Sequence, residues 1–175
     1  MESSEFLGFL KSRSSVRSYT GDQLSPDEIR YLFTAASTAP SAGNREAWDV
    51  IVCRQDDLLE ALADAAYGQE FIREAGAVCV VCANYVRSMS RYGERGILYA
   101  VQDATIAGTY MMLAAHALRR ATCWVGAFEE DEVRELLGIP THVRPVAILA
   151  IGEAAEHASS PERMPAHEHL HEDYW

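Results

Sequence analysis

Two arginines and two serines lie within five residues near the N-terminus, in the segment Arg13-Ser14-Ser15-Val16-Arg17. A guanidinium group is a planar, permanently charged donor and a serine hydroxyl is a short neutral one, so together they can surround a phosphate. The whole chain carries a formal charge of −11, from 26 acidic and 15 basic residues. This segment concentrates positive charge although the chain as a whole is acidic, so we interpret the cluster as a candidate phosphate site. The alternative is a pair of solvated surface arginines.

Other reactive side chains occur in patterns that fit catalysis less well. Cys79 and Cys82 stand three apart in a predicted strand, so their side chains should point to opposite faces, about 10 Å apart and beyond the reach of a disulfide. We interpret both as buried, inert thiols rather than as a redox or zinc pair. The alternating histidines His167, His169 and His171 lack a second cluster that would complete a tetrahedral site, so we predict no metal.

Length and composition indicate one globular domain. The chain has 175 residues, 49% hydrophobic and 23% charged, which is typical of a folded core, and we expect a single domain over residues 1–175. Its acidic charge disfavours nucleic acid and anionic membranes as partners.

The sequence holds no G-x-S-x-G, G-x-G-x-x-G or Walker-type loop, so a hydrolase triad or a Rossmann or P-loop site is not supported. No secretory signal pattern is present, which favours a cytoplasmic protein with free cysteines.

Alternating helical and strand patterns must position the arginine cluster. Ser25 and Glu28 form a capping box with Pro26 at the first helical position, which predicts a helix start. Residues 76–83 are almost continuously apolar, as is typical of a central strand. The predicted helices span 3–13 behind a serine cap, 26–38, 56–67, 97–120 and 129–137, and the predicted strands span 48–53, 76–83, 122–125 and 145–151. The alternation predicts an α/β or α+β fold with a mixed sheet between helical layers.

The longest predicted helix, 97–120, has small residues on two faces, which allow a close approach to a neighbouring helix. These residues are Ala100, Ala104 and Gly108 on one face, and Ala107, Ala114 and Ala115 on the other. We interpret the small faces as a helix contact across a dimer, and the alternative is packing in the core of the chain itself. Asp103, in the middle of this helix, is expected to be a structural carboxylate bonded to backbone or arginine rather than a catalytic acid.

Four separated segments repeat, in order, the motifs of one known family. They are RSSVRSY at 13–19; APSAGN at 39–44 with Trp48; YGERG at 92–96 with Gln102, Asp103 and TCWVGAF at 122–128; and LGIP at 137–140 with RPVA at 144–147 and RMP at 163–165. Together they resemble the FMN-dependent nitroreductase family, in particular its short single-domain members, over residues 8–175. Three departures are Ser14 for the family's second arginine, Glu46-Ala47 for its Gln-Pro, and residues 119–121 for its Gly-Leu-Gly. They alter the substrate face more than the flavin site.

The resemblance implies an α+β fold, an α/β/α sandwich with a mixed, mainly antiparallel central sheet. It also implies a homodimer with the long helix at its interface and FMN bound between the subunits. Electrons would pass from NADH or NADPH through the flavin to an electron-poor acceptor, such as a nitroaromatic or a quinone, in a ping-pong cycle. The alternatives on the same fold are a specialised flavin reaction, such as reductive dehalogenation or a step of cofactor biosynthesis, and a flavin-binding protein without catalysis. The sequence does not indicate whether NADH or NADPH is the electron donor, or which compound is the acceptor.

By position, the resemblance assigns residues to parts of the cofactor. The phosphate would be held by Arg13, Ser14, Ser15 and Arg163. Arg17 would face the N1/O2 edge of the ring, where negative charge collects on reduction. The other subunit would cover the ring and ribityl chain with Pro40, Ser41, Ala42 and Asn44. The ring near N5 would be lined by Trp124, Val125 and Gly126, with Gln69 at the pyrimidine edge.

Two qualifications apply to what the resemblance implies. Trp124 is interpreted equally well as an aromatic side chain of the core. In this family the flavin carries the chemistry and the protein supplies position and electrostatics, so we assign no catalytic residue on the chain itself.

Overall fold

A four-stranded antiparallel sheet forms the centre of the molecule, with the strands in the order β1-β2-β4-β3. The computed structural model describes residues 2–156, 158–159 and 161–175. The strands are β1 (Trp48–Cys53), β2 (Ala77–Asn84), β3 (Ala121–Val125) and β4 (Val143–Gly152). A single parallel bridge, between Ser15 and Thr122, adds the N-terminal segment beside β3. The expected α+β class with a mainly antiparallel sheet is therefore confirmed.

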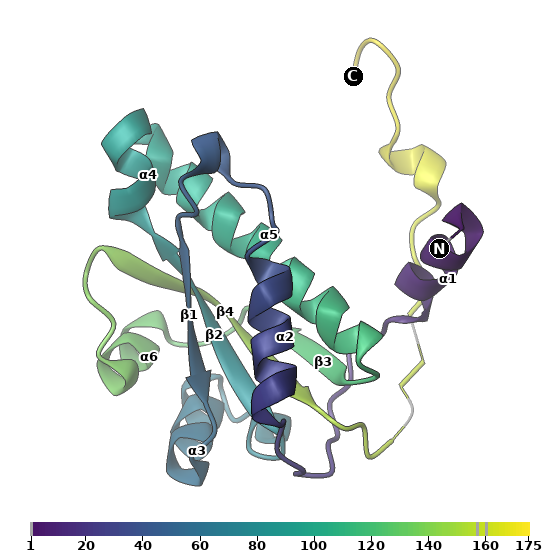
Figure 1. Cartoon of the computed structure of the whole chain (residues 1–175), viewed down its shortest axis with the longest axis vertical. Helices are drawn as coiled ribbons and strands as arrows, with labels where there is room; N and C mark the ends of the chain where they lie inside the picture. Colours follow the sequence, from purple (N-terminus) through teal and green to yellow (C-terminus); the bar gives the residue numbers. More distant parts are fainter. Residues whose placement is uncertain (1, 157, 160) are drawn as a thin grey trace.

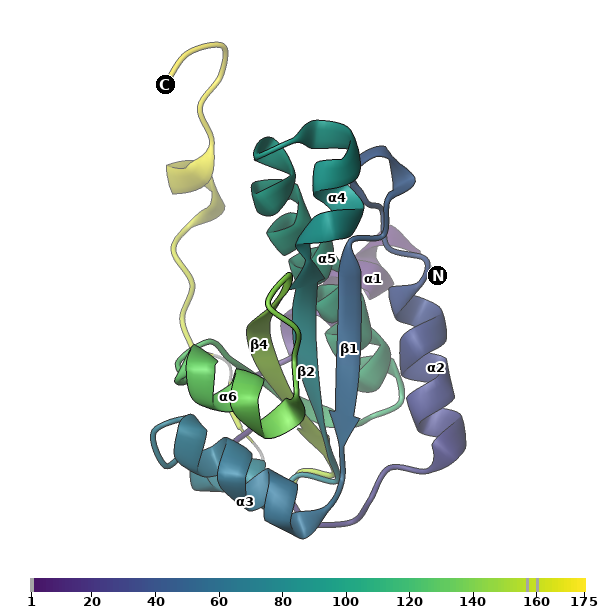
Figure 2. The same cartoon turned by 90° about the vertical axis from the view of Figure 1, so that its left-hand side faces the viewer.

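Helices cover both faces of the sheet (Figures 1 and 2). One face packs against α2 (Pro26–Ala36) and the 23-residue α5 (Arg95–Ala117), and the opposite face packs against α3 (Asp56–Ala65) and α6 (Glu130–Leu137). Two further helices lie outside these layers: α1 (Ser3–Ser12) and α4 (Tyr85–Tyr92). Short 3-10 turns occur at Ala42–Asn44, Glu70–Ile72 and Ala166–His169. No helix in the described part of the chain is long and apolar enough to cross a bilayer.

Strand β2 is the predicted central strand. All eight of its residues are buried, between β1 on one side and β4 on the other. Cys79 packs in the cluster below α2 and α5, whereas Cys82 packs in the cluster below α3 and α6, so the two thiols face opposite sides as expected. Burial raises the pKa of each thiol to about 12. Both are free cysteines that stay protonated at neutral pH, which fits an inert role.

Two helix starts illustrate where local sequence decides the structure. The Ser25 hydroxyl accepts from the Glu28 backbone N–H (3.3 Å), and the Glu28 carboxylate accepts from the Ser25 N–H (2.8 Å), so the predicted capping box is confirmed. The serine cap predicted for α1 is wrong. Glu2 caps this helix instead, in a reciprocal pair with Glu5. Helix α4 is absent from the sequence prediction.

The small residues of α5 pack inside the chain, so their interpretation as a contact across a dimer is wrong and the core alternative holds. All six are buried. A Cβ added to Gly108 would lie 2.9 Å from the Trp124 indole, which shows how closely the helix approaches β3. The outward face of α5 instead exposes Ile97, Leu98 and Tyr110, which are 41%, 51% and 37% exposed.

Asp103 connects α5 to the loop that precedes β1. Its side chain is 2% exposed. One carboxylate oxygen accepts from the Ala42 N–H (2.8 Å) and the other accepts from the Ala47 N–H (3.3 Å). This is the structural role expected for Asp103, because a buried carboxylate needs such donors to offset its loss of water.

The substitution Asp103→Asn is expected to lower the free energy of unfolding by roughly 2–3 kcal/mol, because the amide keeps one acceptor oxygen and turns an NH2 group toward the second backbone N–H. Urea unfolding at neutral pH measures the change. The control is Asp131→Asn, which removes an exposed carboxylate from the first turn of α6 and should change stability by less than about 0.5 kcal/mol. Equal stability of the two variants would contradict the role given to Asp103.

Candidate functional site

The arginine and serine cluster is fixed to the edge of the sheet. The Val16 N–H donates to the Thr122 carbonyl of β3 (3.0 Å), next to the bridge formed by Ser15. The buried Tyr19 hydroxyl anchors the end of the segment by donating to the carbonyls of Val16 (2.8 Å) and Ala150 (3.3 Å). The backbone of the cluster therefore runs beside β3, where the last turn of α5 also ends.

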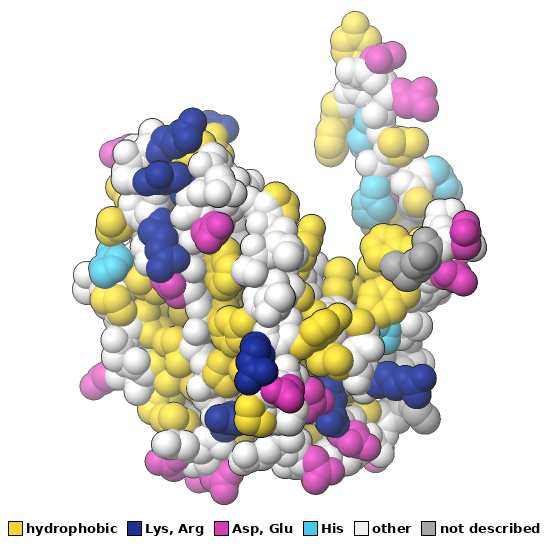
Figure 3. Space-filling view, viewed as in Figure 1, with side chains coloured by type: hydrophobic (Ala, Val, Ile, Leu, Met, Phe, Trp, Pro, Cys, Tyr) yellow, Lys and Arg dark blue, Asp and Glu magenta, His cyan; other side chains and the backbone are white. Residues whose placement is uncertain are grey.

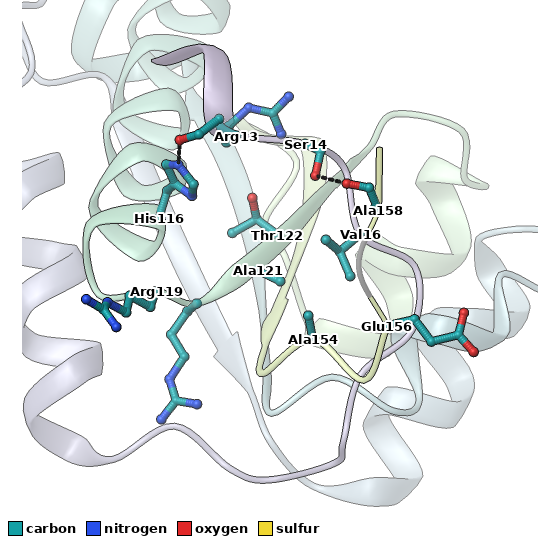
Figure 4. A pocket seen from close by; sticks show the side chains of 12 residues that line it. Arg13, Ser14, Val16, His116, Arg119, Ala121, Thr122, Ala154, Glu156 and Ala158 are labelled. Carbon is teal, nitrogen blue, oxygen red and sulfur yellow. Dashed lines mark hydrogen bonds between the residues drawn. The ribbon is translucent and has the colours of Figure 1, made fainter. Parts of the chain in front are cut away.

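A hollow of about 300 Å³ opens at this place, and we call it the cationic hollow (Figure 4). Arg13 and Ser14 come from the N-terminal segment, and the Ser14 hydroxyl donates to the Ala158 carbonyl (3.1 Å). His116, at the end of α5, lies with Nε2 2.8 Å from the Ser12 hydroxyl. The remaining lining residues include Arg119, Arg120, Thr122 and Glu156.

Thr122 gives the cationic hollow an unsatisfied donor. Its side chain is 1% exposed, and its hydroxyl has no hydrogen-bond partner among the described residues. Figure 4 places this side chain in the middle of the lining residues. A buried hydroxyl without a partner costs about 1–3 kcal/mol, which a bound oxyanion would recover. The residues present at this site therefore fit a phosphate.

The predicted site has two further arginines near the cationic hollow, Arg163 and Arg17. Arg163 and Arg13 line a neighbouring hollow of about 310 Å³, so the structure brings this predicted pair together. Arg17 is exposed. Burial raises the pKa of the Cys123 thiol, and the nearby charges of Arg17 and Arg13 partly oppose that rise. Both guanidinium groups are thus close enough to β3 to act on it electrostatically.

The loop predicted to cover the flavin forms a second hollow, of about 570 Å³, against α5. The hollow is lined by Pro40, Ser41, Ala42, Tyr99, Val101, Gln102, Asp103, Thr105 and Ile106. The Ser41 hydroxyl accepts from the Glu46 N–H (3.0 Å). Asn44 is exposed and has a positive φ of 55°. Gly43, with φ 56°, sits so close to α4 that an added Cβ would collide with the Tyr92 hydroxyl.

The two groups of predicted residues lie toward opposite ends of one helix. Asp103 holds the 40–47 loop, and His116 lines the cationic hollow. Thirteen residues separate them (103 to 116), which corresponds to about 20 Å along an α-helix. Within one chain, the arginine cluster and the 40–44 loop do not form a common site.

The residues predicted near N5 are distributed between the core and the surface. The indole of Trp124 packs on Gly108 of α5, as the core interpretation expects, and Val125 is buried on the other face of the sheet. Only Gly126 is exposed. The Gln69 side chain donates to the Ala127 carbonyl (3.2 Å), so Gln69 does lie beside the turn that follows β3.

Sequence reasoning missed His116, Arg119 and Thr122 as parts of the cationic hollow. One signal could have found them. Residues 116–122 pass directly from the predicted long helix into the TCWVGAF segment, so side chains on either side of this short connection must share one edge of the sheet.

In the described ranges, no group of three or more His, Cys, Asp or Glu side chains could hold a metal ion.

A family model and two relatives each match most of the sequence of this chain. The model of the nitroreductase family matches residues 10–153. A protein of Archaeoglobus fulgidus described as an NADH dehydrogenase/NAD(P)H nitroreductase is 33% identical over 152 residues, covering 85% of this chain and 84% of that protein. An FMN reductase (NADPH) of Bacillus subtilis is 27% identical over 173 residues, covering 91% of this chain and 70% of that protein.

Comparison of the folds agrees with the sequences. The structure of NfrA1 from B. megaterium superimposes with a TM-score of 0.92 at 24% identity, covering 98% of this chain and 75% of that one. The family match extends from the arginine cluster to the end of β4, and so includes the 40–47 loop and the lining of the cationic hollow up to Thr122, but not Ala154, Glu156 and Ala158. The chain belongs to the nitroreductase family.

Proposed function

We propose that this protein is an NAD(P)H-dependent flavin oxidoreductase that uses FMN. The observation that carries the proposal is the cationic hollow, in which a buried, unpartnered Thr122 hydroxyl lies beside Arg13 and Ser14. The names of the relatives, an NAD(P)H nitroreductase and an FMN reductase, support the same activity. When bound, FMN would accept two electrons from NADH or NADPH and pass them to an electron-poor acceptor such as a nitroaromatic or a quinone.

The arginine cluster would hold the phosphate of FMN. That phosphate carries close to two negative charges at neutral pH, and Arg13, Ser14, Ser15 and Arg163 supply the charge and hydrogen bonds around it. We add the Thr122 hydroxyl to this set, because the phosphate would satisfy it. Arg17 would lie at the N1/O2 edge of the ring and stabilise negative charge there. Gln69 and Gly126 would border the ring from the turn after β3.

The remaining part of the site would come from a second copy of the chain. A groove of about 790 Å³ between α1, α2 and α5 is lined by apolar side chains, among them Phe6, Phe9, Tyr31, Tyr110 and Leu113. Helix α1 has no buried residue, and it projects from the body together with the C-terminal tail (Figure 1). In the tail, Leu170, Tyr174 and Trp175 are exposed. Large exposed apolar patches mark interaction surfaces, so we assign this one to a homodimer.

The dimer explains why the two parts of the site are far apart in one chain. If the α5 helices of two copies pack side by side in opposite directions about a two-fold axis, the 40–44 loop of one copy approaches the cationic hollow of the other. Pro40, Ser41, Ala42 and Asn44 would then cover a flavin whose phosphate is held by the partner. Each copy contributes one domain over residues 1–175, and neither copy has a complete site alone.

The phosphate assignment predicts the effect of two single substitutions. Arg13→Ala and Arg163→Ala should each weaken FMN binding by about 10- to 150-fold, because each removes a charge-assisted hydrogen bond worth roughly 1.5–3 kcal/mol. Fluorescence titration of the apoprotein with FMN measures the affinity. Arg54→Ala, which removes an exposed arginine at the other end of β1, is the control. Full affinity in both variants would show that the phosphate lies elsewhere.

The shared site predicts that assembly and flavin binding are lost together. The wild type should have a mass of about 39 kDa in light scattering, twice the 19.4 kDa of one chain. Tyr110→Glu places a charge in the apolar groove and should give a monomer that loses FMN, with its circular dichroism unchanged. The control Val86→Glu, at a position that is 58% exposed on α4, should remain dimeric. A monomeric wild type that binds FMN tightly would refute the shared site.

The position given to Arg17 predicts a change in redox potential. Arg17→Gln should lower the midpoint potential of bound FMN by roughly 30–60 mV, because the loss of about 1.4–2.8 kcal/mol falls on the reduced, negatively charged ring. Affinity for oxidised FMN should change less. Photoreduction beside a reference dye measures both proteins under the same conditions. A solvated arginine with no role in the site would leave the potential unchanged.

A further inference from the structure

Positive charge gathers on the surface around α4, away from the cationic hollow (Figure 3). Arg91 comes from α4, Arg95 from the start of α5, and Arg45 from the loop before β1. Two tyrosines, Tyr92 and Tyr99, lie among them. We call these five residues the α4 patch.

None of the arginines of the α4 patch is paired with a carboxylate among the described residues. Six of the fourteen arginines do form such ion pairs: Arg30, Arg73, Arg87, Arg120, Arg134 and Arg144. Glu46 and Glu94 are the nearest acids in the sequence to Arg45 and Arg95, and neither makes an ion pair with them. The patch therefore keeps its positive charge in a protein whose net charge is −11.

Neutral groups hold these guanidinium groups in place. Arg95 donates from Nε to the Tyr99 hydroxyl (2.6 Å) and lies over its ring, and Arg91 lies over the Tyr92 ring with Cζ 5.6 Å from the centroid. Arg45 donates to the Arg87 carbonyl (3.3 Å) and to the Ser90 hydroxyl (2.9 Å). Side chains that are already ordered lose less entropy when they bind an anion.

The α4 patch borders the loop that we propose covers the flavin. A Cβ on Gly43 would lie 3.1 Å from Nη1 of Arg91, so this guanidinium stands directly against the loop. Tyr99 lines the 570 Å³ hollow together with Pro40, Ser41 and Ala42. A nucleotide whose nicotinamide reaches the flavin beneath this loop would extend its opposite end across the rim where the arginines lie.

The geometry points to the 2′-phosphate of NADPH as the ligand of the α4 patch, with Arg91 and Arg95 as its main contacts. This inference rests on the proposed function and adds the choice of donor to it. NADPH differs from NADH only by this phosphate, which carries nearly two negative charges, and arginine forks suit phosphate oxygens. Unpaired, ordered arginines beside the covering loop would strengthen the binding of NADPH but not the binding of NADH. The enzyme should therefore prefer NADPH.

The test compares donors in the FMN-loaded protein. In the double variant Arg91→Gln/Arg95→Gln, the KM for NADPH should rise roughly 5- to 20-fold, whereas KM and kcat with NADH should stay within about twofold. The double variant Arg91→Lys/Arg95→Lys, which keeps the charge, should recover part of the NADPH preference. A matched control that also removes two exposed arginines, Arg30→Gln/Arg54→Gln, should leave both KM values unchanged. Equal changes for NADH and NADPH, or no change, would overturn the inference.

A binding experiment separates this inference from the proposed function. Titration of the wild type with 2′,5′-ADP and with 5′-AMP, followed by NMR, should show tighter binding of 2′,5′-ADP, and the Arg91→Gln/Arg95→Gln variant should lose that difference. The preference should also weaken at high salt, since exposed charges are screened. If the wild type oxidised neither nucleotide but still preferred 2′,5′-ADP, the proposed function would fail and the patch would stand. Equal binding of the two probes by the wild type refutes the patch.

Discussion

The hydrogen bonds from two backbone N–H groups to Asp103 connect α5 to the 40–47 loop and to the start of β1. A carboxylate that is 2% exposed needs donors for both oxygens, and the 40–47 loop supplies them at Ala42 and Ala47. Because Ala47 directly precedes β1, the same carboxylate fixes where this strand enters the sheet. The loop in turn holds Gly43 against Tyr92 and Arg91. One buried charge thus sets the positions of a loop, an edge strand and the surface of α4.

The fold was predicted best where sequence and local structure agree. Strand β1 was predicted with its observed bounds, and the Ser25 capping box needs only residues within one turn. Helix α4 was missed for a physical reason. It is only eight residues long and polar overall, Val86 and Met89 are 58% and 36% exposed, and its buried residue is Ser88, so the segment does not stand out from a polar loop in the sequence. Pairing and burial that depend on distant elements are invisible to such patterns.

The candidate site shows the same division between local and distant information. The spacing of Arg13 and Ser14 was sufficient to suggest a phosphate, because both residues belong to one short segment. Thr122 lies outside that segment. The connection from α5 to β3 could have placed it near the cluster, but only the structure shows that its buried hydroxyl has no partner among the described residues. The small residues of α5 were assigned to the wrong contact for a similar reason. A small face predicts a close neighbour, but it does not say whether that neighbour belongs to the same chain.

The separation of the two half-sites along α5 also has a genetic consequence. In the proposed dimer, each flavin is held by the arginine cluster of one chain and covered by the 40–44 loop of the other. Two alleles, one defective in the cluster and one defective in the loop, would each encode an inactive protein. Heterodimers formed by co-expressing them would contain one doubly defective site and one fully intact site. The two alleles would therefore complement each other, whereas two alleles defective in the same half-site would not.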